Sequence, residues 1–377
     1  MRVLFVISGL GLGGAEKQLI MLSRQLVHRG HSVCIYALTQ FVPRAGDLAG
    51  SSVELIVEPK SARLDMRVIL RLRRHIQVWR PDIVHGFLYD GNVYARLATF
   101  GLGVPMLDSE RNDNYSLSTL KSIGYFLTAG MSSGIVANSY SGADFANRKY
   151  MKPGKGSHVL WNGIDLTEVD HRVATAGLHH SELFPEPGLK RVAVVGNFKP
   201  QKDLRLALRV ARSLIDVDSR WRMIVVGGEL PGKTTGYKRD VIRTRDELGL
   251  QDHVNFVGSR RDVLEIISSC DAVLVTSHHE GFPNIVLEAM ACRSPVVSTE
   301  YSDVRRILPM DWQVVSSRNE SDLAQALLRC DREHANVIAA QRRWVETHAT
   351  PGICADRLLS IYALYTTHAS ALSEQVG

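Results

Sequence analysis

Two kinds of hydrophobic pattern alternate along the chain. Short runs of consecutive apolar residues are typical of strands buried on both faces, and apolar residues that recur every three or four positions are typical of amphipathic helices. Strands separated by helices predict an α/β fold with parallel sheets and helices on both faces. The predicted strands lie at residues 2–7, 31–38 and 81–92 in the first half, and at 190–196, 223–226, 254–256, 272–275 and 295–297 in the second.

The periodic pattern is lost between residues 166 and 189, where histidines and prolines gather. We predict a linker there, between a first domain of residues 1–168 and a second domain of residues 186–354. A chain of 377 residues is long enough for two domains with separate cores. The last periodic segment, residues 353–372, predicts a helix.

The composition is ordinary for a soluble globular protein, with 45% hydrophobic and 22% charged residues. No apolar run reaches the roughly 18 residues that a membrane-spanning helix needs. The cysteines are odd in number and scattered without metal-ligand spacing, which predicts reduced thiols in a cytoplasmic protein. They are Cys34, Cys270, Cys292, Cys330 and Cys354.

The net charge of +6 and the isoelectric point near 9.1 favour an anionic partner. Residues 60–79 predict a basic amphipathic helix, which is typical of either a solvated helix covering a sheet or a helix lying on a membrane surface. Its arginines are Arg63, Arg67, Arg71 and Arg74. Nucleic-acid binding is disfavoured because basic residues are not interleaved with aromatic ones.

A glycine-rich turn follows the first predicted strand. Gly9, Gly11 and Gly14 satisfy the dinucleotide fingerprint G-x-G-x-x-G, so a nicotinamide-dependent oxidoreductase has to be considered. That fingerprint requires an acidic residue at the end of the second strand to hold a ribose. Residues 37–40 are Ala-Leu-Thr-Gln, so the oxidoreductase interpretation is disfavoured.

Residues 272–290 predict a strand, a loop and a helix that begins near Pro283, because a proline in the first turn loses no hydrogen bond. Glu280 then lies on the loop, and Glu288 lies in the helix below N–H groups that attract an anion. Two carboxylates around an anion site suggest a ligand with both phosphate and hydroxyl groups.

The segment from Glu280 to Glu288, with Gly-Phe-Pro-Asn between them, resembles the donor-site motif of the retaining GT-B glycosyltransferases of group 1, also called family 4. The resemblance implies two Rossmann-like domains that face each other across a cleft, with the C-terminal helix, about residues 355–377, crossing back to the first domain. It also implies a nucleotide diphosphate sugar as donor, with Glu280 on the sugar hydroxyls and Glu288 on the ribose.

Other segments carry the same resemblance. The family's Gly-Arg-x-x-x-x-Lys is matched at Lys202, but Asn197 stands where arginine is usual, and Lys199 can supply the missing charge. The donor-binding residues that the resemblance implies are Gly13, Gly14, Asn197, Lys199, Lys202, Gly258, Arg260, Glu280, Gly281, Phe282, Pro283, Asn284, Ile285 and Glu288.

The acceptor side departs from the family pattern. Only His85 matches the family's His-x-His, and Phe87 and Asp90 occupy the other positions, so either His85 or Asp90 faces the reacting sugar. Glu110, Arg111 and Asn112 resemble a family segment that lines the acceptor side. The candidate catalytic residues are therefore His85, Asp90, Lys202 and Glu280.

The resemblance implies sugar transfer with retention, from a UDP- or GDP-sugar to a hydroxyl of a glycan or lipid-linked acceptor, in cell-surface polysaccharide or glycolipid synthesis. We expect no cofactor and no catalytic metal, because Lys202 and a helix N-terminus supply positive charge for the leaving diphosphate. An anionic membrane surface is a further expected partner, which would make the cytoplasmic protein a peripheral one. A sugar-nucleotide epimerase of the same two-domain plan and a non-catalytic sugar-nucleotide binding protein remain as alternatives.

Overall fold

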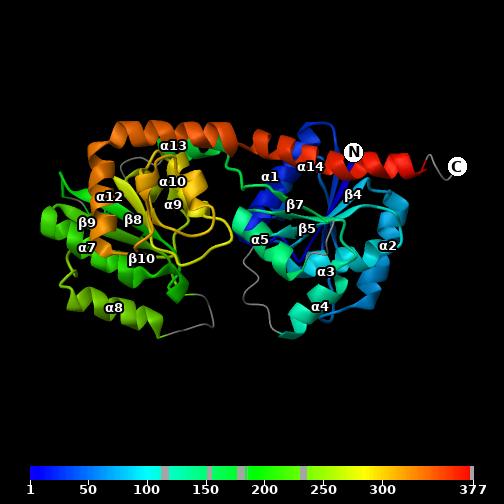
Figure 1. Ribbon diagram of the computed structural model, residues 1–377, viewed down its shortest axis with the longest axis horizontal. Coiled ribbons are helices and arrows are strands. Elements are labelled where there is room, and N and C mark those ends of the chain that lie inside the picture. The colour runs from blue at the N-terminus through cyan, green and yellow to red at the C-terminus, as the bar shows by residue number, and fades with distance from the viewer. Residues whose placement is uncertain (112–118, 151–154, 176–182, 185, 230–235, 374–377) are drawn as a thin grey trace. The chain divides into compact units, whose positions relative to one another are not determined.

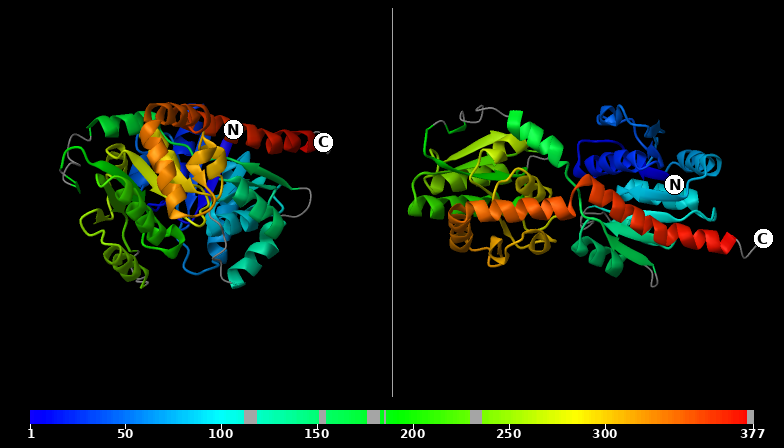
Figure 2. Two further views of the ribbon diagram at one scale, coloured as in Figure 1. Left: turned by 60° about the vertical axis from the view of Figure 1, so that its left-hand side comes forward. Right: turned by 90° about the horizontal axis from the view of Figure 1, so that it is seen from above.

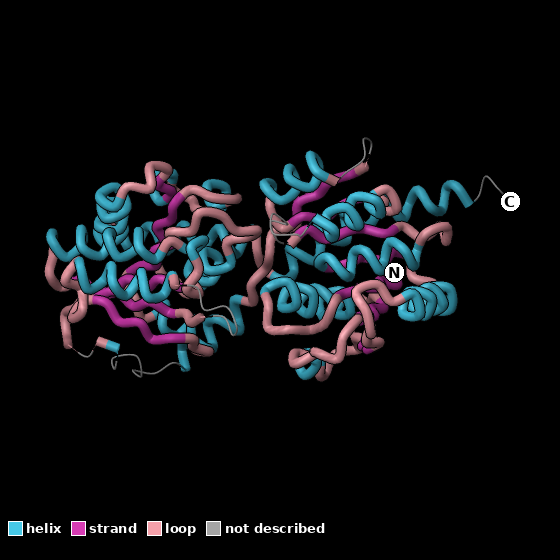
Figure 3. The backbone as a smooth tube through the Cα atoms, turned by 90° about the horizontal axis from the view of Figure 1, so that it is seen from below, coloured by secondary structure: helices cyan, strands magenta, loops and turns pink. Residues whose placement is uncertain are grey.

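The computed structural model describes residues 1–111, 119–150, 155–175, 183–184, 186–229 and 236–373. The chain divides into two compact units. The first consists of Met1–Gly163 together with Pro351–Gly377, and the second is Ile164–Thr350. Each unit is built on its own parallel sheet between helices, as Figure 3 shows. The predicted α/β class with two parallel sheets is confirmed.

The sheet of the first unit has seven strands within the described residues, in the order β3-β2-β1-β4-β5-β6-β7. The strands are β1 (Arg2–Ile7), β2 (Ser32–Ala37), β3 (Glu54–Val57), β4 (Ile83–Phe87), β5 (Met106–Glu110), β6 (Gly134–Ala137) and β7 (Gly156–Val159). The helices are α1 (Gly14–His28), α2 (Met66–Trp79), α3 (Leu88–Thr99), α4 (Thr119–Ala129), α5 (Tyr140–Lys149) and α14 (Pro351–Ser373), with a short 3₁₀ turn at Ala45–Leu48.

Alternate residues of β1 enter two different cores, because successive side chains of a strand point to opposite faces. Val3, Phe5 and Ile7 pack against α1 and α14, whereas Leu4 and Val6 pack against α2 and α3. Helix α14 lies beside α1 (Figures 1 and 2), and Arg29 Nε donates to Asp356 Oδ1 at 2.9 Å between them. The last helix of the chain is thus part of the first unit.

The sheet of the second unit has six strands within the described residues, in the order β10-β9-β8-β11-β12-β13. The strands are β8 (Lys190–Val195), β9 (Trp221–Val226), β10 (Val254–Gly258), β11 (Ala272–Val275), β12 (Val296–Thr299) and β13 (Val314–Val315). The helices are α6 (Leu166–Thr175), α7 (Leu204–Val217), α8 (Tyr237–Glu247), α9 (Val263–Ser268), α10 (Asn284–Ala291), α11 (Val304–Ile307), α12 (Glu320–Arg332) and α13 (His334–His348), with 3₁₀ turns at Pro200–Lys202 and Asp311–Gln313.

Three predicted boundaries need correction. The first unit ends at Gly163 rather than 168, because residues 166–175 form α6, which belongs to the second unit and is tied to α9 by an ion pair of Arg172 with Glu265. The predicted helix at 60–79 begins only at Met66, since the side chain of Asp65 caps it by accepting from the Arg67 N–H at 3.0 Å. The predicted strand at 81–92 ends at Phe87, and α3 starts at the next residue.

All five cysteines are buried and free. Burial raises the pKa of each thiol to about 12. Within the described residues, none of the helices combines the length and the apolar character needed to cross a membrane.

Candidate functional site

In the second unit, the predicted donor-binding residues gather at one edge of the sheet. The carboxyl ends of parallel strands share an edge, and ligands bind there at the point where the strand order reverses. In this sheet the reversal lies between β8 and β11, since β9 and β10 extend the sheet on one side and β12 and β13 on the other. Lys202 follows β8 and Glu280 follows β11, so both lie on loops at the reversal.

Lys202 and Glu280 contact each other directly. Lys202 Nζ lies 2.8 Å from Glu280 Oε1, and both side chains are largely buried. The Ser277 hydroxyl donates to the same carboxylate oxygen at 2.5 Å. Burial, and second the charge of Glu280, keep the pKa of Tyr301 well above its ordinary value, so that this phenol stays neutral. The pair thus presents one ammonium and one carboxylate at the reversal point.

The two loops that carry this pair are joined by hydrogen bonds to backbone carbonyls. The His278 N–H donates to the Gln201 carbonyl at 2.8 Å, and Gln201 Nε2 donates to the His279 carbonyl at 2.6 Å. The Thr276 hydroxyl donates to the Lys202 carbonyl at 2.8 Å. These contacts hold the loop after β8 and the loop after β11 side by side.

Helix α10 follows the Glu280 loop. It begins at Asn284, one residue later than expected, and Pro283 occupies the cap position. Glu288 lies one turn into the helix and is partly exposed, whereas Phe282 and Ile285 are buried. Gly281 contributes a carbonyl that accepts from the Ser302 hydroxyl at 3.0 Å.

The other predicted donor residues in this unit surround the same edge. Asn197 lies just after β8 and before the turn at Pro200–Lys202, its side-chain oxygen accepts from the Gly228 N–H at 3.4 Å, and Lys199 is exposed. Gly258 ends β10 with a φ of +71°, a conformation that favours glycine. Arg260 is exposed and forms an ion pair with Asp262 at 2.6 Å.

In the first unit, the sheet order reverses between β1 and β4. Gly14 begins α1 and Gly13 occupies its cap position, at the end of the turn that follows β1, and Asp90 lies in the first turn of α3 directly after β4. The Glu16 carboxylate covers the glycine turn so closely that a Cβ on Gly13 would lie 2.4 Å from its Oε2. Asp90 is partly exposed and pairs with Lys60 Nζ at 2.8 Å.

His85 lies in the core rather than on this edge. Its side chain is 0% exposed. Nδ1 lies 2.7 Å from the Tyr362 hydroxyl, and Nε2 lies 3.1 Å from the Ser109 hydroxyl. Burial, and second the charge of Arg111, keep the pKa of His85 well below its ordinary value. Of the two candidates on the acceptor side, the geometry therefore favours Asp90.

Glu110 ends strand β5 and Arg111 follows it directly, and both are buried; Asn112 lies outside the described residues. Arg111 Nη1 donates to Asn162 Oδ1 at 3.1 Å, and its guanidinium lies 5.0 Å from the centre of the Phe87 ring. Burial lowers the pKa of Arg111 to about 10, so it remains a cation at neutral pH.

The sequence interpretation missed two residues that contact the Lys202 and Glu280 loops. Asp203 follows Lys202 directly, and its carboxylate forms an ion pair with Arg318 at 2.7 Å. Arg318 comes from the loop after β13, far along the chain, and no motif marks it. Asp203 could have been found from its place before the amphipathic helix α7, which is typical of a cap.

The sequence is similar to known families and proteins. The profile described as "Glycosyl transferases group 1" matches residues 189–332, and the profile described as "Glycosyltransferase Family 4" matches residues 12–168. Together they span more than half of the chain. A D-inositol 3-phosphate glycosyltransferase of Mycobacterium sp. (strain KMS) is 34% identical over 145 residues, which are 37% of this chain but only 31% of that relative. An Actinosynnema mirum protein of the same name is 24% identical and aligns with 84% of this chain and 83% of its own length.

Solved structures are similar in fold. The Anabaena protein HepE in complex with UDP has a TM-score of 0.80 at 17% identity, covering 96% of this chain and all of that one (100%). Sucrose-phosphate synthase from Thermosynechococcus elongatus has a TM-score of 0.78 at 16% identity, covering 98% and 100%. The two α/β units thus have the GT-B fold. With both sequence profiles matched on this fold, the chain belongs to the group 1, family 4 glycosyltransferases.

Proposed function

We propose that this protein is a retaining glycosyltransferase, which moves a sugar from a UDP- or GDP-sugar to a hydroxyl of a glycan or lipid-linked acceptor. The observation that carries the proposal is the contact of Lys202 with Glu280 at the point where the strand order of the second unit reverses. The names of the relatives support glycosyl transfer, and complexes of the structural neighbour HepE with UDP and with UDP-glucose support a nucleotide sugar as donor.

Each member of the pair has a role in this reaction. Glu280 accepts hydrogen bonds from the hydroxyls of the transferred sugar. Lys202 has three N–H donors, so it can keep its contact with Glu280 and still donate to an oxygen of the diphosphate. Negative charge grows on the leaving diphosphate in the transition state, and a fixed cation there lowers the barrier. The proposal includes no catalytic metal, and Glu288 holds the ribose.

The acceptor side is proposed to lie on the first unit, with Asp90 nearest to the reacting hydroxyl. A lipid-linked acceptor would bring the protein to an anionic membrane surface. Three arginines of α2, Arg67, Arg71 and Arg74, are exposed, and so are the apolar side chains of Met66 and Leu70 on the same helix. Helix α4 contacts α3, as α2 does (Figure 1), and it exposes a second apolar face. That face consists of Ile123, Phe126 and Leu127.

The proposal is tested by thermal unfolding with UDP, GDP, UDP-glucose and GDP-mannose. A ligand at a hundredfold excess over its Kd stabilises the folded protein by about 2.7 kcal/mol, which raises the unfolding temperature by several degrees. Any sugar nucleotide that binds is then assayed for release of UDP or GDP, with and without candidate acceptors.

Lys202→Ala is expected to lower kcat at least a hundredfold, while the affinity for the bare nucleotide falls much less, because the cation acts mainly in the transition state. The control is Arg243→Ala, which removes an exposed cation from α8 of the same unit. Equal kcat values for Lys202→Ala and the parent would refute the role of Lys202. Conversion of the sugar nucleotide without acceptor would indicate an epimerase, and binding without any turnover would indicate a non-catalytic protein.

A further inference from the structure

Three residues with unusual backbone conformations meet at the Glu280 loop. Among the described residues, six that are not glycine have a positive φ, and three of them are Asp203 (φ 44°), Ser302 (φ 45°) and Arg318 (φ 51°). Side chains other than Asn and Asp rarely adopt this region, and holding one there costs about 1–3 kcal/mol. Ser302 contacts the carbonyl of Gly281, and Arg318 contacts the carbonyls of Thr276 and Ser277.

Both terminal nitrogens of the Arg318 guanidinium group donate hydrogen bonds to carbonyls of the loop after β11. Nη1 donates to the Ser277 carbonyl at 3.0 Å, and Nη2 donates to the Thr276 carbonyl at 2.9 Å. Nη2 also lies 2.7 Å from Asp203 Oδ2. The planar guanidinium fixes the relative positions of its acceptors, which a lysine ammonium cannot do.

Asp203 connects Arg318 to the turn that carries Lys202. Its other carboxylate oxygen, Oδ1, accepts from the Leu206 N–H at 3.2 Å and so caps α7, which starts directly after the turn. One carboxylate therefore holds the start of α7 and Arg318 together. Arg318 thereby joins the loop that presents Lys202 to the loop that presents Glu280, and it touches neither of these two side chains.

We propose that Arg318 is a positioning residue, which holds the loops after β8 and β11 in register so that Lys202 and Glu280 meet at 2.8 Å. Its role in turnover rests on the proposed function, whereas its role in holding the loops does not. The strained backbone of Arg318 is kept because the contacts of its side chain offset the cost, and glycine at this position would remove both the strain and the contacts.

The test compares Arg318→Gly with a matched control, Arg80→Gly. Arg80 has almost the same φ, 50°, at the end of α2 in the first unit, far along the chain from either loop. Both substitutions remove the strain of a left-handed backbone conformation, because glycine adopts a positive φ without strain. We therefore expect the unfolding temperature of each variant to stay within about 2 °C of that of the parent. Arg318→Lys is the second variant, because it keeps the positive charge but loses the two guanidinium nitrogens that donate to the carbonyls of Ser277 and Thr276.

Hydrogen–deuterium exchange of the protein without ligand measures how firmly Arg318 holds the loop after β11. In Arg318→Gly, the amides of residues 276–282 should exchange about tenfold faster or more, with a smaller increase in Arg318→Lys and none in Arg80→Gly. Unchanged exchange of this segment in Arg318→Gly would overturn the proposal, and this result is obtained whether or not the protein transfers sugar.

Steady-state kinetics measures the consequence for the reaction. With a sugar nucleotide that the parent turns over, kcat of Arg318→Gly should fall about tenfold or more, while the Kd for UDP or GDP changes less than about threefold. A kcat within twofold of the parent would overturn the positioning role even if the loop exchanges faster. A parent that turns over none of the sugar nucleotides would contradict the proposed function. The exchange experiment would still show whether Arg318 holds the loop after β11.

Discussion

The imidazole of His85 is enclosed by Tyr362, Ser109 and the ring of Phe5, whose centre lies 5.7 Å away. The ring stays neutral there, because burial opposes its charged form and the nearby Arg111 cation opposes it further. A histidine in this setting links β4 to α14 and β5. His85 therefore stabilises the core of the first unit, and it is Asp90, the more exposed of the two candidates, that the proposed function places nearest to the reacting hydroxyl.

The lowered pKa of His85 predicts a dependence of stability on pH. Below the ordinary histidine pKa of about 6.5, His85 binds a proton in the unfolded chain but stays neutral in the folded protein. The contribution of His85 to the free energy of unfolding is therefore fully present above pH 6.5 and is lost as the pH falls. This residue contributes up to about 1.4 kcal/mol per pH unit. The unfolding temperature of His85→Gln should therefore decline less steeply between pH 6.5 and pH 5 than that of the parent. Parallel declines would contradict the prediction.

The sequence predicts single residues well where one short segment carries the signal. Lys202 and Glu280 were both selected from local motifs, and the structure brings them into contact. Arg318 could not be found in this way, because its partners Thr276, Ser277 and Asp203 come from other parts of the chain. The burial of His85 was equally hidden, since it depends on Tyr362 from the last helix.

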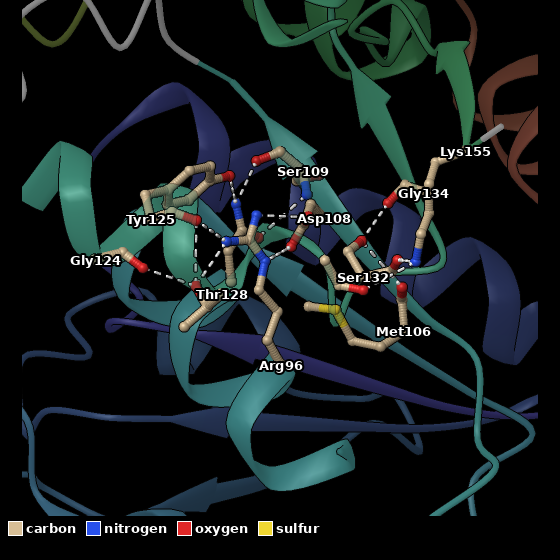
Figure 4. A network of polar contacts seen from close by, with 12 residues as sticks. Arg96, Met106, Asp108, Ser109, Gly124, Tyr125, Thr128, Ser132, Gly134 and Lys155 are labelled. Carbon is tan, nitrogen blue, oxygen red and sulfur yellow. Dashed lines mark hydrogen bonds and ion pairs between the residues drawn. The ribbon is translucent and has the colours of Figure 1, made fainter. Parts of the chain in front are cut away.

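A buried ion pair attaches α4 to the sheet (Figure 4). Arg96 of α3 donates to both carboxylate oxygens of Asp108, at 2.9 and 2.7 Å, and to the carbonyl of Tyr125 in α4 at 2.9 Å. Its guanidinium lies 4.0 Å from the centre of the Tyr125 ring. Arg96 and Asp108 are each only 1% exposed, so their charges depend on each other.

Removing Arg96 alone should be costly. Arg96→Met leaves the Asp108 carboxylate buried without its partner, and breaking a buried pair in this way costs about 3–5 kcal/mol. Arg96→Met combined with Asp108→Leu should be less destabilised than Arg96→Met, because no charge is left unpaired. Denaturant unfolding measures both. Arg212→Met, which removes an exposed ion pair with Asp216, is the control and should cost less than about 1 kcal/mol.

At the scale of elements, periodicity predicted which segments are helices and strands better than where they begin. The predicted strand at 81–92 was too long, because its apolar run continues into α3 without a capping residue. The chain changes direction at Leu88, with a φ of 62°, and Gly91 then passes so close to β1 that a Cβ would lie 2.3 Å from the Val6 carbonyl oxygen. Neither contact is visible in a hydrophobic pattern.

At the scale of the whole molecule, the positive charge predicts binding to anionic membranes through the exposed arginines of α2. Each arginine near an anionic surface contributes about 1 kcal/mol, so the protein should sediment with anionic vesicles and not with neutral ones, and salt should release it. Arg67→Glu with Arg74→Glu should abolish this binding. Arg71 is less suitable, since it pairs with Glu58 at 2.8 Å.

The control for vesicle binding is Arg332→Glu with Arg343→Glu, which changes the net charge equally on exposed positions of the second unit. Equal loss of binding in both double variants would attribute the effect to net charge alone. Equal binding of the parent to neutral and anionic vesicles would refute the membrane proposal.

The sequence predicted the two parallel sheets because strand and helix patterns repeat regularly in both halves. The linker was placed too late, because loss of periodicity at 166–189 includes the charged helix α6, whose buried residue is Val169. A short helix with few apolar positions gives a weak periodic signal. Packing against α9 decides where α6 belongs, and only the structure contains that information.

The position of α14 has a consequence for how the chain matures on the ribosome. Residues 1–163 are translated before α14, so α1 lacks its neighbour and His85 lacks the Tyr362 hydroxyl until α14 has been made. Domains usually complete their folding in the order of synthesis. Here residues 164–350 are contiguous and can complete their folding first. The apolar face of the first unit that α14 covers stays exposed until α14 has been made. We therefore expect the nascent chain to be most prone to aggregation over residues 1–163 until α14 has been made.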